Sequence, residues 1–226
     1  MFDEIRAFLD RDPAARGVTG VLEVVLSYSG YHAIKMHRLA HFLHKLKVPL
    51  LPRLISQFSR FITGIEIHPG AQIGRRFFID HGMGVVIGET TVIGDDCTLF
   101  QGVTLGGTGK ESGKRHPNLG NNVLVGAGAK ILGNITIGDN CKIGAQSLVL
   151  HDVPPNCTVV GVPGQVVRRE GQKPPKADMN QIDLPDPIMD CITQIQQRLD
   201  TLVEERVRAV LADMGITPVH PRHDAD

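Results

Sequence analysis

The chain has 226 residues, 24 basic and 24 acidic side chains, and 42% hydrophobic residues. This is enough apolar chain for one good-sized domain with attachments, and the zero net charge excludes a broad nucleic-acid-binding patch as the main feature. No apolar run approaches the ~18 residues of a membrane span, and the charged start does not resemble a signal peptide. The four cysteines lack metal-binding spacing. We therefore expect a cytoplasmic protein with no metal and no nucleic-acid or membrane partner.

Apolar residues in the first part of the chain, residues 1–62, recur at three- and four-residue intervals. This spacing predicts a small helical region of three or four helices. Four histidines fall in it at near-helical spacing, namely His32, His37, His41 and His44. They could form a metal site, but solvated or capping histidines on an amphipathic surface are the favoured interpretation.

A different period governs residues 63–166. Aliphatic residues recur every six positions, with a two-residue slip after Val85 and an insertion at 107–118. A period of six fits neither an α-helix nor an alternating strand, and it predicts a three-sided parallel β-helix with one short strand per hexapeptide. The fourteen positions are Ile67, Ile73, Ile79, Val85, Ile87, Ile93, Leu99, Leu105, Leu119, Val125, Ile131, Ile137, Ile143 and Val149.

These aliphatic side chains are expected to point inward, each contributing about 1.5–3 kcal/mol on burial. Cys97 and Cys141 take small inward positions of the same repeat, so we interpret them as core fillers and not as reactive thiols. Every Phe and Tyr lies at or before Phe100, which agrees with a narrow interior that excludes large rings.

Residues 167–187 are polar and proline-rich, and we interpret them as a linker. Beyond them, residues 188–214 are predicted to form a carboxy-terminal helix whose apolar residues are spaced as in a coiled coil. These residues are Ile188, Ile192, Ile195, Leu199 and Leu202. Such a stripe needs a partner; copies of the same helix are the simplest one, and packing back onto the chain's own domain is the alternative.

The first candidate for chemistry is His81, which occupies an outward turn position that the core does not need. Carboxylates at Glu66 and Asp80 are candidates to hold its imidazole. A histidine backed by a carboxylate suits general-base catalysis, because the acid fixes the tautomer and stabilises the imidazolium. An ordinary surface turn is the competing interpretation.

The second candidate is the insertion 107–118, a polar, glycine-rich, basic loop that ends in Arg115 and His116. An arginine fork beside a second titratable ring is suited to carboxylate recognition. Small residues at 126–129 and 144–145 would let a ligand lie along the backbone, with Lys130 or Lys142 near a phosphate. Ordinary tight turns with solvated lysines fit these last segments equally well.

Several segments together resemble the serine O-acetyltransferases. The resemblance covers roughly residues 11–166 and is specific, because few other hexapeptide-repeat acyltransferases share these segments in this order. The segments are Asp80-His81-Gly82-Met83-Gly84, Gly88-Glu89-Thr90, residues 103–110, Arg115-His116-Pro117, residues 126–133 and Gly161-Val162-Pro163, with Arg11-Asp12-Pro13-Ala14 and Gly30-Tyr31-His32-Ala33 upstream.

The resemblance implies a left-handed β-helix trimer that moves acetyl from acetyl-CoA to the hydroxyl of L-serine, giving O-acetylserine for cysteine biosynthesis. By motif position, His81 is the general base and Glu66 its orienting carboxylate. The residues expected to hold serine are Asp12, Asp80, Arg115 and His116. Those expected along acetyl-CoA between protomers are Gly107, Ala127 and Ala145, with Lys130 and Lys142 as the phosphate candidates.

The resemblance also bears on partners. Inhibition by L-cysteine through the serine pocket is expected, because the pocket residues are present. The family pattern has Asp where this chain has Glu66, and the helical region is short, which leaves hexamer formation open. Members that dock with O-acetylserine sulfhydrylase usually end in Ile, whereas this chain ends in Asp226, so weak or absent docking, or docking by another route, is expected.

Three rival functions are kept open. An acetyltransferase of the same fold could use a sugar or homoserine, and the homoserine carboxylate would also satisfy Arg115. A metal-dependent solenoid resembling the γ-type carbonic anhydrases needs three histidines, but position 121 is Asn. A non-catalytic scaffold would use helix 188–214 to assemble partners.

Overall fold

The computed structural model describes residues 2–15, 17–109, 112–168 and 187–213. The chain divides into two units, residues 1–185 and 186–226. The first contains the helical region and the β-helix, and the second contains helix α5 (Pro187–Asp213). Nearly all of the predicted linker 167–187 lies outside the described residues.

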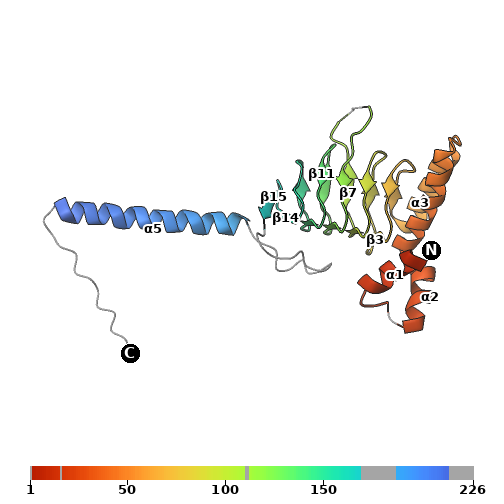
Figure 1. Cartoon of the computed structure of the whole chain (residues 1–226), viewed down its shortest axis with the longest axis horizontal. Helices are drawn as coiled ribbons and strands as arrows, with labels where there is room; N and C mark the ends of the chain where they lie inside the picture. Colours follow the sequence, from red (N-terminus) through yellow and green to blue (C-terminus); the bar gives the residue numbers. More distant parts are fainter. Residues whose placement is uncertain (1, 16, 110–111, 169–186, 214–226) are drawn as a thin grey trace. The chain divides into compact units, whose positions relative to one another are not determined.

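Four helices gather at the first coil of the β-helix (Figure 1). Pro13 lies two residues after the end of α1 and cannot continue its hydrogen-bonding pattern, because it has no amide proton. Gly64 ends α4 with a φ of +72°, the left-handed conformation that glycine adopts without penalty. The helices are α1 (Phe2–Arg11), α2 (Gly17–Ser27), α3 (Ser29–Lys45) and α4 (Leu51–Thr63). No helix in the described ranges combines the length and apolar character needed to cross a bilayer.

The predicted left-handed parallel β-helix is confirmed. Its three faces are sheets in which successive coils pair in parallel, and only β14 and β15 pair antiparallel. Face A contains β1 (Glu66–Ile67), β4 (Val86–Ile87), β7 (Thr104–Gly106), β10 (Lys130–Leu132) and β13 (Leu148–Val149). Face B contains β2 (Gln72–Ile73), β5 (Val92–Ile93), β8 (Asn118–Leu119) and β11 (Thr136–Ile137). Face C contains β3 (Phe78–Ile79), β6 (Thr98–Leu99), β9 (Leu124–Val125), β12 (Lys142–Ile143), β14 (Cys157–Val160) and β15 (Gln165–Arg168).

The turns between faces form three edges, which we name for what they carry. The histidine edge, between faces C and A, comprises turns 80–85, 100–103, 126–129 and 144–147. The loop edge, between faces A and B, comprises turns 68–71, 88–91, 107–117 and 133–135. The arginine edge, between faces B and C, comprises turns 74–77, 94–97, 120–123 and 138–141.

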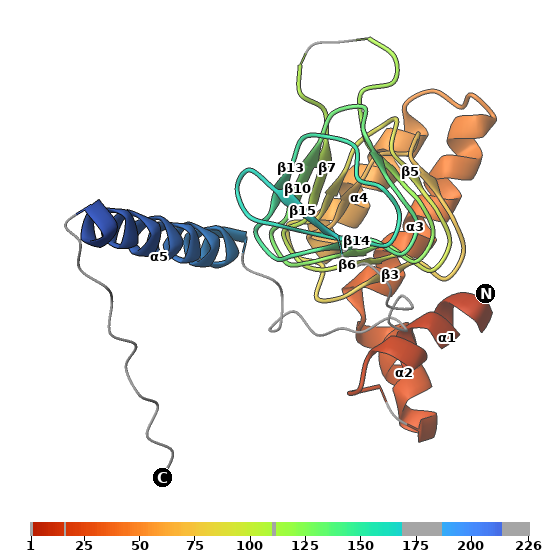
Figure 2. The same cartoon turned by 60° about the vertical axis from the view of Figure 1, so that its left-hand side comes forward.

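The pairing register explains both irregularities of the repeat. Val86 pairs with Thr104 after 18 residues, whereas Glu66 pairs with Val86 after 20. The two extra residues belong to the turn that carries His81. Thr104 pairs with Lys130 after 26 residues, because the insertion leaves the prism on the loop edge (Figure 2). Both departures from the hexapeptide period therefore lie at candidate site residues.

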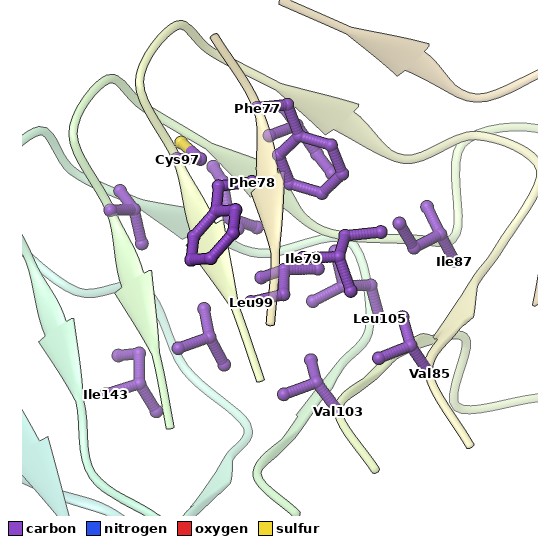
Figure 3. Packing of buried hydrophobic residues seen from close by; sticks show 14 of the residues in the cluster. Phe77, Phe78, Ile79, Val85, Ile87, Cys97, Leu99, Val103, Leu105 and Ile143 are labelled. Carbon is purple, nitrogen blue, oxygen red and sulfur yellow. The ribbon is translucent and has the colours of Figure 1, made fainter. Parts of the chain in front are cut away.

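The core is the inward aliphatic column that the repeat predicts (Figure 3). The expectation that the interior excludes large rings is wrong for the first coil, where Phe77 and Phe78 are fully buried. Of the fourteen aliphatic residues, all except half-buried Ile73 are buried. Burial raises the pKa of the Cys97 thiol to about 12 and that of Cys141 to about 11. Both thiols therefore stay protonated at neutral pH, which agrees with their interpretation as core fillers.

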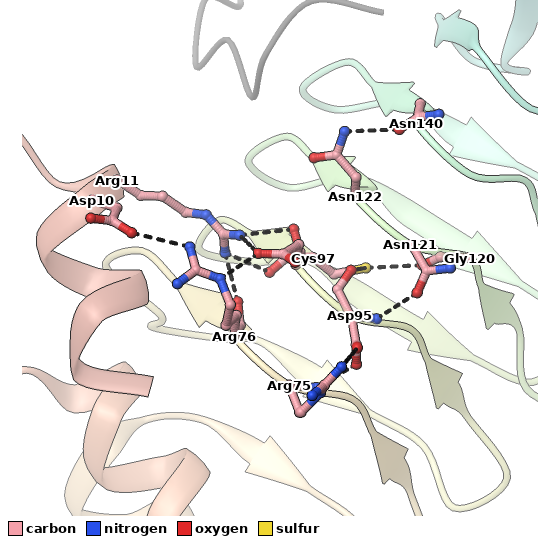
Figure 4. A network of polar contacts seen from close by, with 11 residues as sticks. Asp10, Arg11, Arg75, Arg76, Asp95, Cys97, Gly120, Asn121, Asn122 and Asn140 are labelled. Carbon is pink, nitrogen blue, oxygen red and sulfur yellow. Dashed lines mark hydrogen bonds and ion pairs between the residues drawn. The ribbon is translucent and has the colours of Figure 1, made fainter. Parts of the chain in front are cut away.

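Arg11, at the end of α1, joins the helical region to the arginine edge (Figure 4). The Arg11 side chain is 8% exposed, and its guanidinium donates to the Arg76 carbonyl at 2.8 Å and to the Asp96 carboxylate at 2.9 Å. Arg76 donates to the same carboxylate at 2.7 Å. Because Asp12 is the next residue, this partly buried network also fixes where Asp12 lies.

The interpretation of the four helical histidines as solvated or capping is wrong for His37, which is 3% exposed. Burial lowers its pKa to about 3, so the ring is neutral. His41 Nδ1 lies 2.7 Å from the Pro69 carbonyl, and His32 Nε2 lies 2.8 Å from that of Val25. Among the described residues, no group of three or more His, Cys, Asp or Glu is placed to hold a metal ion.

Candidate active site

A cavity of about 400 Å³ opens where the first helices meet the turn after β3. The helical region and the β-helix both line it, so neither forms it alone. Its polar lining residues are Asp12, Ser27, Tyr28, Ser29, Asp80 and His81. Two carboxylates thus face the same space as the candidate base.

The Asp12 carboxylate is held in place by two donors. One oxygen accepts from the Ala14 amide at 2.8 Å, and the other accepts from the Tyr28 hydroxyl at 2.5 Å. The bond to Asp12 raises the pKa of Tyr28 to about 12, so the phenol remains a donor. Burial raises the pKa of Asp80, and the charge of nearby Asp12 raises it further. This concentration of negative charge suits an ammonium group.

His81 lies at the mouth of the cavity with its side chain 73% exposed. Its φ is +58°, a left-handed conformation that is uncommon for a residue with a Cβ and is often found at functional sites. Ser29 Oγ donates to its carbonyl at 3.1 Å, and its Nε2 lies 3.9 Å from an Asp80 oxygen. The imidazole is therefore accessible to a substrate.

Glu66 is close to this turn in the fold but is not bonded to His81. Its backbone amide donates to the Val85 carbonyl at 2.9 Å, while its carboxylate lies 3.4 Å from the Arg60 guanidinium of α4. No hydrogen bond joins Glu66 to His81 in the described structure. The dyad expected from the sequence is thus not formed here.

Arg115 and His116 lie on the loop edge, where Thr90 orients both. Thr90 Oγ1 accepts from the amides of Arg115 and His116, each at 3.1 Å, and lies 2.9 Å from His116 Nδ1. The Thr90 amide also donates to Nδ1 at 3.2 Å. Because an amide N–H can only donate, Nδ1 accepts, and the neutral ring carries its proton on Nε2.

Burial lowers the pKa of His116, and the Arg115 charge lowers it further, so the ring is neutral at pH 7. Arg115 is bonded to the Glu89 carboxylate, and that bond lowers the pKa of Glu89. Lys114 Nζ donates to the carbonyls of Thr90 at 2.5 Å and His116 at 2.6 Å, which closes the base of the insertion. The loop edge thus presents an arginine and an Nε2–H donor, a pair suited to a carboxylate.

The structure supplies roles that the sequence did not assign. Tyr28, Glu89 and Thr90 hold candidate residues in place through side-chain contacts between distant coils and helices. Glu89 and Thr90 belong to a segment of the family resemblance, but nothing in the segment indicates which atoms they contact. A signal was available in the register, because turn 88–91 lies on the same edge as the insertion.

The two clusters lie on different edges of one protomer. Six residues at ~3.3 Å each span up to about 20 Å along one face of the prism, beyond the reach of an arginine side chain. No contact between His81 and either Arg115 or His116 occurs among the described residues. One chain alone therefore does not bring the base and the carboxylate-binding pair together.

The residues expected along acetyl-CoA are also divided between the histidine edge and the loop edge. Ala127 and Ala145 lie on successive turns of the histidine edge, where the Gln146 amide donates to the Ala127 carbonyl at 2.8 Å. Gly107 lies on the loop edge beside Arg115. Lys130 Nζ donates to the Gly102 carbonyl at 2.5 Å, so its ammonium is held by the backbone in this structure. Lys142 lies in β12 on face C.

Comparison with known proteins defines the family. Residues 116–151 match the bacterial transferase hexapeptide family (six repeats). The chain is 59% identical to the serine acetyltransferase of Bacillus subtilis over 90% of this chain and 92% of that protein. It is 52% identical to that of Synechococcus elongatus, over 94% and 89% respectively. The chain belongs to the serine acetyltransferase family.

Solved structures of serine acetyltransferases match the fold. The Brucella abortus enzyme in complex with coenzyme A is 46% identical and superposes with a TM-score of 0.72, over 76% of this chain and 68% of that one. The Neisseria gonorrhoeae enzyme in complex with serine is 43% identical, with a TM-score of 0.70 over 74% and 66%. A serine acetyltransferase in complex with cysteine gives a TM-score of 0.76 at 43% identity, over 80% and 69%.

The electrostatics of the cavity generate a prediction for Asp80→Asn. The raised pKa means that the folded state binds the Asp80 proton more tightly than the unfolded state does. The protonated Asp80 therefore stabilises the folded state. This stabilisation is complete below pH 3.8, the pKa of the side chain in the unfolded chain, and is lost as the pH rises through the higher pKa of the folded state. The amide carries no charge, so the variant should have the higher Tm at pH 7, and the difference should shrink toward pH 4.

The measurement is thermal unfolding of both proteins across this pH range. Asp12→Asn is the matched control: it should bring no gain, because Asp12 accepts two hydrogen bonds and the amide nitrogen cannot accept. A lower Tm for Asp80→Asn at pH 7 would contradict the electrostatic account.

Proposed function

We propose that this chain transfers acetyl from acetyl-CoA to the hydroxyl of L-serine, giving O-acetyl-L-serine and CoA for cysteine biosynthesis. The observation that carries the proposal is an acidic cavity beside an exposed His81, together with an arginine–histidine pair on another edge of the same prism. Identity of 59% to a serine acetyltransferase over most of both chains supports the same reaction. Relatives solved with serine and with coenzyme A support the two substrates.

Each end of the amino acid has a matching group. The serine ammonium binds between Asp12 and Asp80, because the cavity concentrates two carboxylates. The serine carboxylate accepts from the Arg115 guanidinium and from the Nε2–H of His116. Homoserine has the same two charged ends, so exclusion of homoserine depends on the distance between the two clusters and His81.

His81 is the general base in this proposal. Its imidazole accepts the proton of the serine hydroxyl while the oxygen attacks the thioester carbonyl, and the proton then passes to the departing CoA thiolate. Glu66 orients the imidazole and stabilises the imidazolium. Glu66 pairs with Arg60 in this structure, so that role requires its carboxylate to rotate from Arg60 toward His81. The side chain of Glu is one methylene longer than that of Asp, which lengthens its reach.

A homotrimer completes the site in this proposal. The histidine edge of one protomer meets the loop edge of the next, so each site takes His81, Asp80 and Asp12 from one chain and Arg115 and His116 from another. Met83, in the first turn of the histidine edge, is 68% exposed, and Phe61 of α4 is 86% exposed; such large exposed apolar residues support a covered surface.

Acetyl-CoA lies along the same junction in this proposal. Ala127 and Ala145 of one protomer and Gly107 of the next are small, so the ligand can approach the backbone closely. Lys130 and Lys142 are both candidates for the phosphates, and the Lys130 ammonium would first have to leave the Gly102 carbonyl. The proposed proton transfers use protein side chains and the two substrates, and they call for no metal.

Several finer statements belong to the same proposal. L-Cysteine binds the serine pocket as a feedback inhibitor, which a relative's complex with cysteine supports. Residues 1–62 and 63–166 act as one catalytic unit, since both line the cavity, while 188–214 is a separate helical unit. Weak or absent docking to O-acetylserine sulfhydrylase remains a prediction, and the tail that ends in Asp226 lies outside the described residues.

The first test is thiol release from acetyl-CoA with L-serine, with homoserine and with no acceptor. Release should depend on L-serine, and His81→Ala should lower kcat by ~10²–10⁴, the usual size of a general-base contribution. Thiol release with homoserine alone would mean that homoserine, and not L-serine, is the acceptor. A His81→Ala variant that retains most of its kcat would exclude His81 as the base.

The shared site generates a second prediction. His81→Ala and Arg115→Ala subunits are each defective, but a hybrid trimer of both contains one junction with neither substitution. Random mixing by co-expression should therefore restore about one quarter of wild-type activity at subsaturating serine. A mixture no more active than the two separate variants would mean that each site lies within one chain.

Two adjacent threonines provide a third prediction. Thr90→Val removes the hydroxyl that orients Arg115 and His116, and should raise the KM for L-serine about tenfold, the size of one to two lost hydrogen bonds. Thr91→Val is the matched control, because the buried Thr91 hydroxyl has no hydrogen-bond partner in the described structure. Steady-state kinetics of both variants make the comparison, and equal KM values would contradict the role of Thr90.

A further inference from the structure

Helix α5 carries an apolar stripe that no other residue described in residues 187–213 covers. We define the α5 stripe as Ile188, Ile192, Ile195, Leu199 and Leu202, with Val203 and Val210 beside it. The six of these whose exposure is described, all but Ile188, are between 43% and 59% exposed. A row of half-exposed aliphatic residues along a helix of 27 residues is an association surface.

The residue types on the α5 stripe indicate how many helices associate. Written as heptads, Ile192 and Leu199 are at a positions, and Ile188, Ile195 and Leu202 are at d positions. Isoleucine at both a and d, or leucine at a with isoleucine at d, favours three or more strands over two. Val203 and Val210 fall at e positions and widen the stripe, which a two-stranded coil would leave exposed.

The charges beside the α5 stripe fit copies of the same helix in parallel register. Arg206 occupies the a position of the next heptad, and Glu205 occupies the g position before it. In a parallel, in-register assembly, the g residue of one helix borders the a residue of its neighbour. Each Arg206 can then pair with Glu205 of the adjacent copy, so the same ion pair forms between every two neighbouring helices. An unrelated partner would need to supply this pattern separately.

Covalent connection raises the effective concentration of the helices. Eighteen residues, 169–186, connect the end of β15 to α5, so three chains joined through their β-helices carry three copies of α5 on tethers of equal length. Association of tethered copies is intramolecular, at effective concentrations of about millimolar. We propose that the α5 helices of one trimer form a parallel, in-register three-stranded coiled coil. This inference rests on the homotrimer of the proposed function.

The test compares two positions on α5 in the full-length chain. In a Cys191→Ser background, Leu202→Cys places a thiol at a d position, and Gln197→Cys places one at f, on the opposite face. The native Cys97, Cys141 and Cys157 are buried and are protected from a short bismaleimide reagent. Because the tether is the same, general proximity contributes equally to both variants.

Leu202→Cys should cross-link between chains at least ~10-fold faster than Gln197→Cys, and adding Leu199→Asp to Leu202→Cys should remove the difference. Equal rates for the two cysteines would overturn the proposal, as expected if α5 packs on its own domain or binds another protein. A rate that rises with protein concentration, with products larger than a trimer, would also overturn it in favour of contacts between trimers.

A charge exchange tests the register. Arg206→Glu should slow the Leu202→Cys cross-link, because the introduced carboxylates would repel Glu205 of the neighbouring helices. Adding Glu205→Arg should restore the rate. Failure of the double variant to recover would overturn the in-register pairing. Light scattering and acetyl transfer on the same samples report the trimer and its activity separately, so failure of the coiled coil is distinguishable from failure of the proposed function.

Discussion

The parallel pairing of each coil with the next is the constraint on which the rest of this structure depends. A strand of two or three residues has little stability of its own, so its position is fixed by backbone hydrogen bonds to the coils above and below and by the buried aliphatic column. Because the interior is filled mainly by small and aliphatic side chains, most groups suited to chemistry are carried by the turns. The three edges thus display much of the polar chemistry of this part of the chain in a fixed order.

The residues proposed to act in catalysis and serine binding lie in irregular turns. His81 lies in a turn that is two residues longer than the repeat, and Arg115 and His116 end the insertion. Neither feature is needed by the column, and both place a side chain outside it. The cavity adds a second element, since α1 and α3 bring Asp12, Tyr28 and Ser29 to the same turn. Arg11 fixes that approach by binding backbone carbonyls of the arginine edge.

The negative charge that suits this cavity for binding a cation also lowers the stability of the folded chain. Asp80 is partly buried beside another carboxylate, and its raised pKa reflects the free-energy penalty of the ionised form. A cation with hydrogen-bond donors relieves that penalty, which is how a destabilised carboxylate becomes a binding group. On the loop edge the opposite holds, because Arg115 already has Glu89 as a partner. A ligand carboxylate has to share or displace that partner.

Much of this protein was determined by the sequence alone. The six-residue aliphatic period requires a prism, because no helix or alternating strand has that period, and both breaks in the period coincide with the turn of His81 and the loop of Arg115. What the sequence could not decide were contacts between residues far apart in the chain. These include Glu66 with Arg60, Lys130 with Gly102, Thr90 with His116 and the burial of His37. Such contacts depend on which edges and helices meet, and a local pattern contains no information about distances between edges. The same limit explains why the motifs could propose the site residues as one set, whereas the tertiary structure places them on two edges.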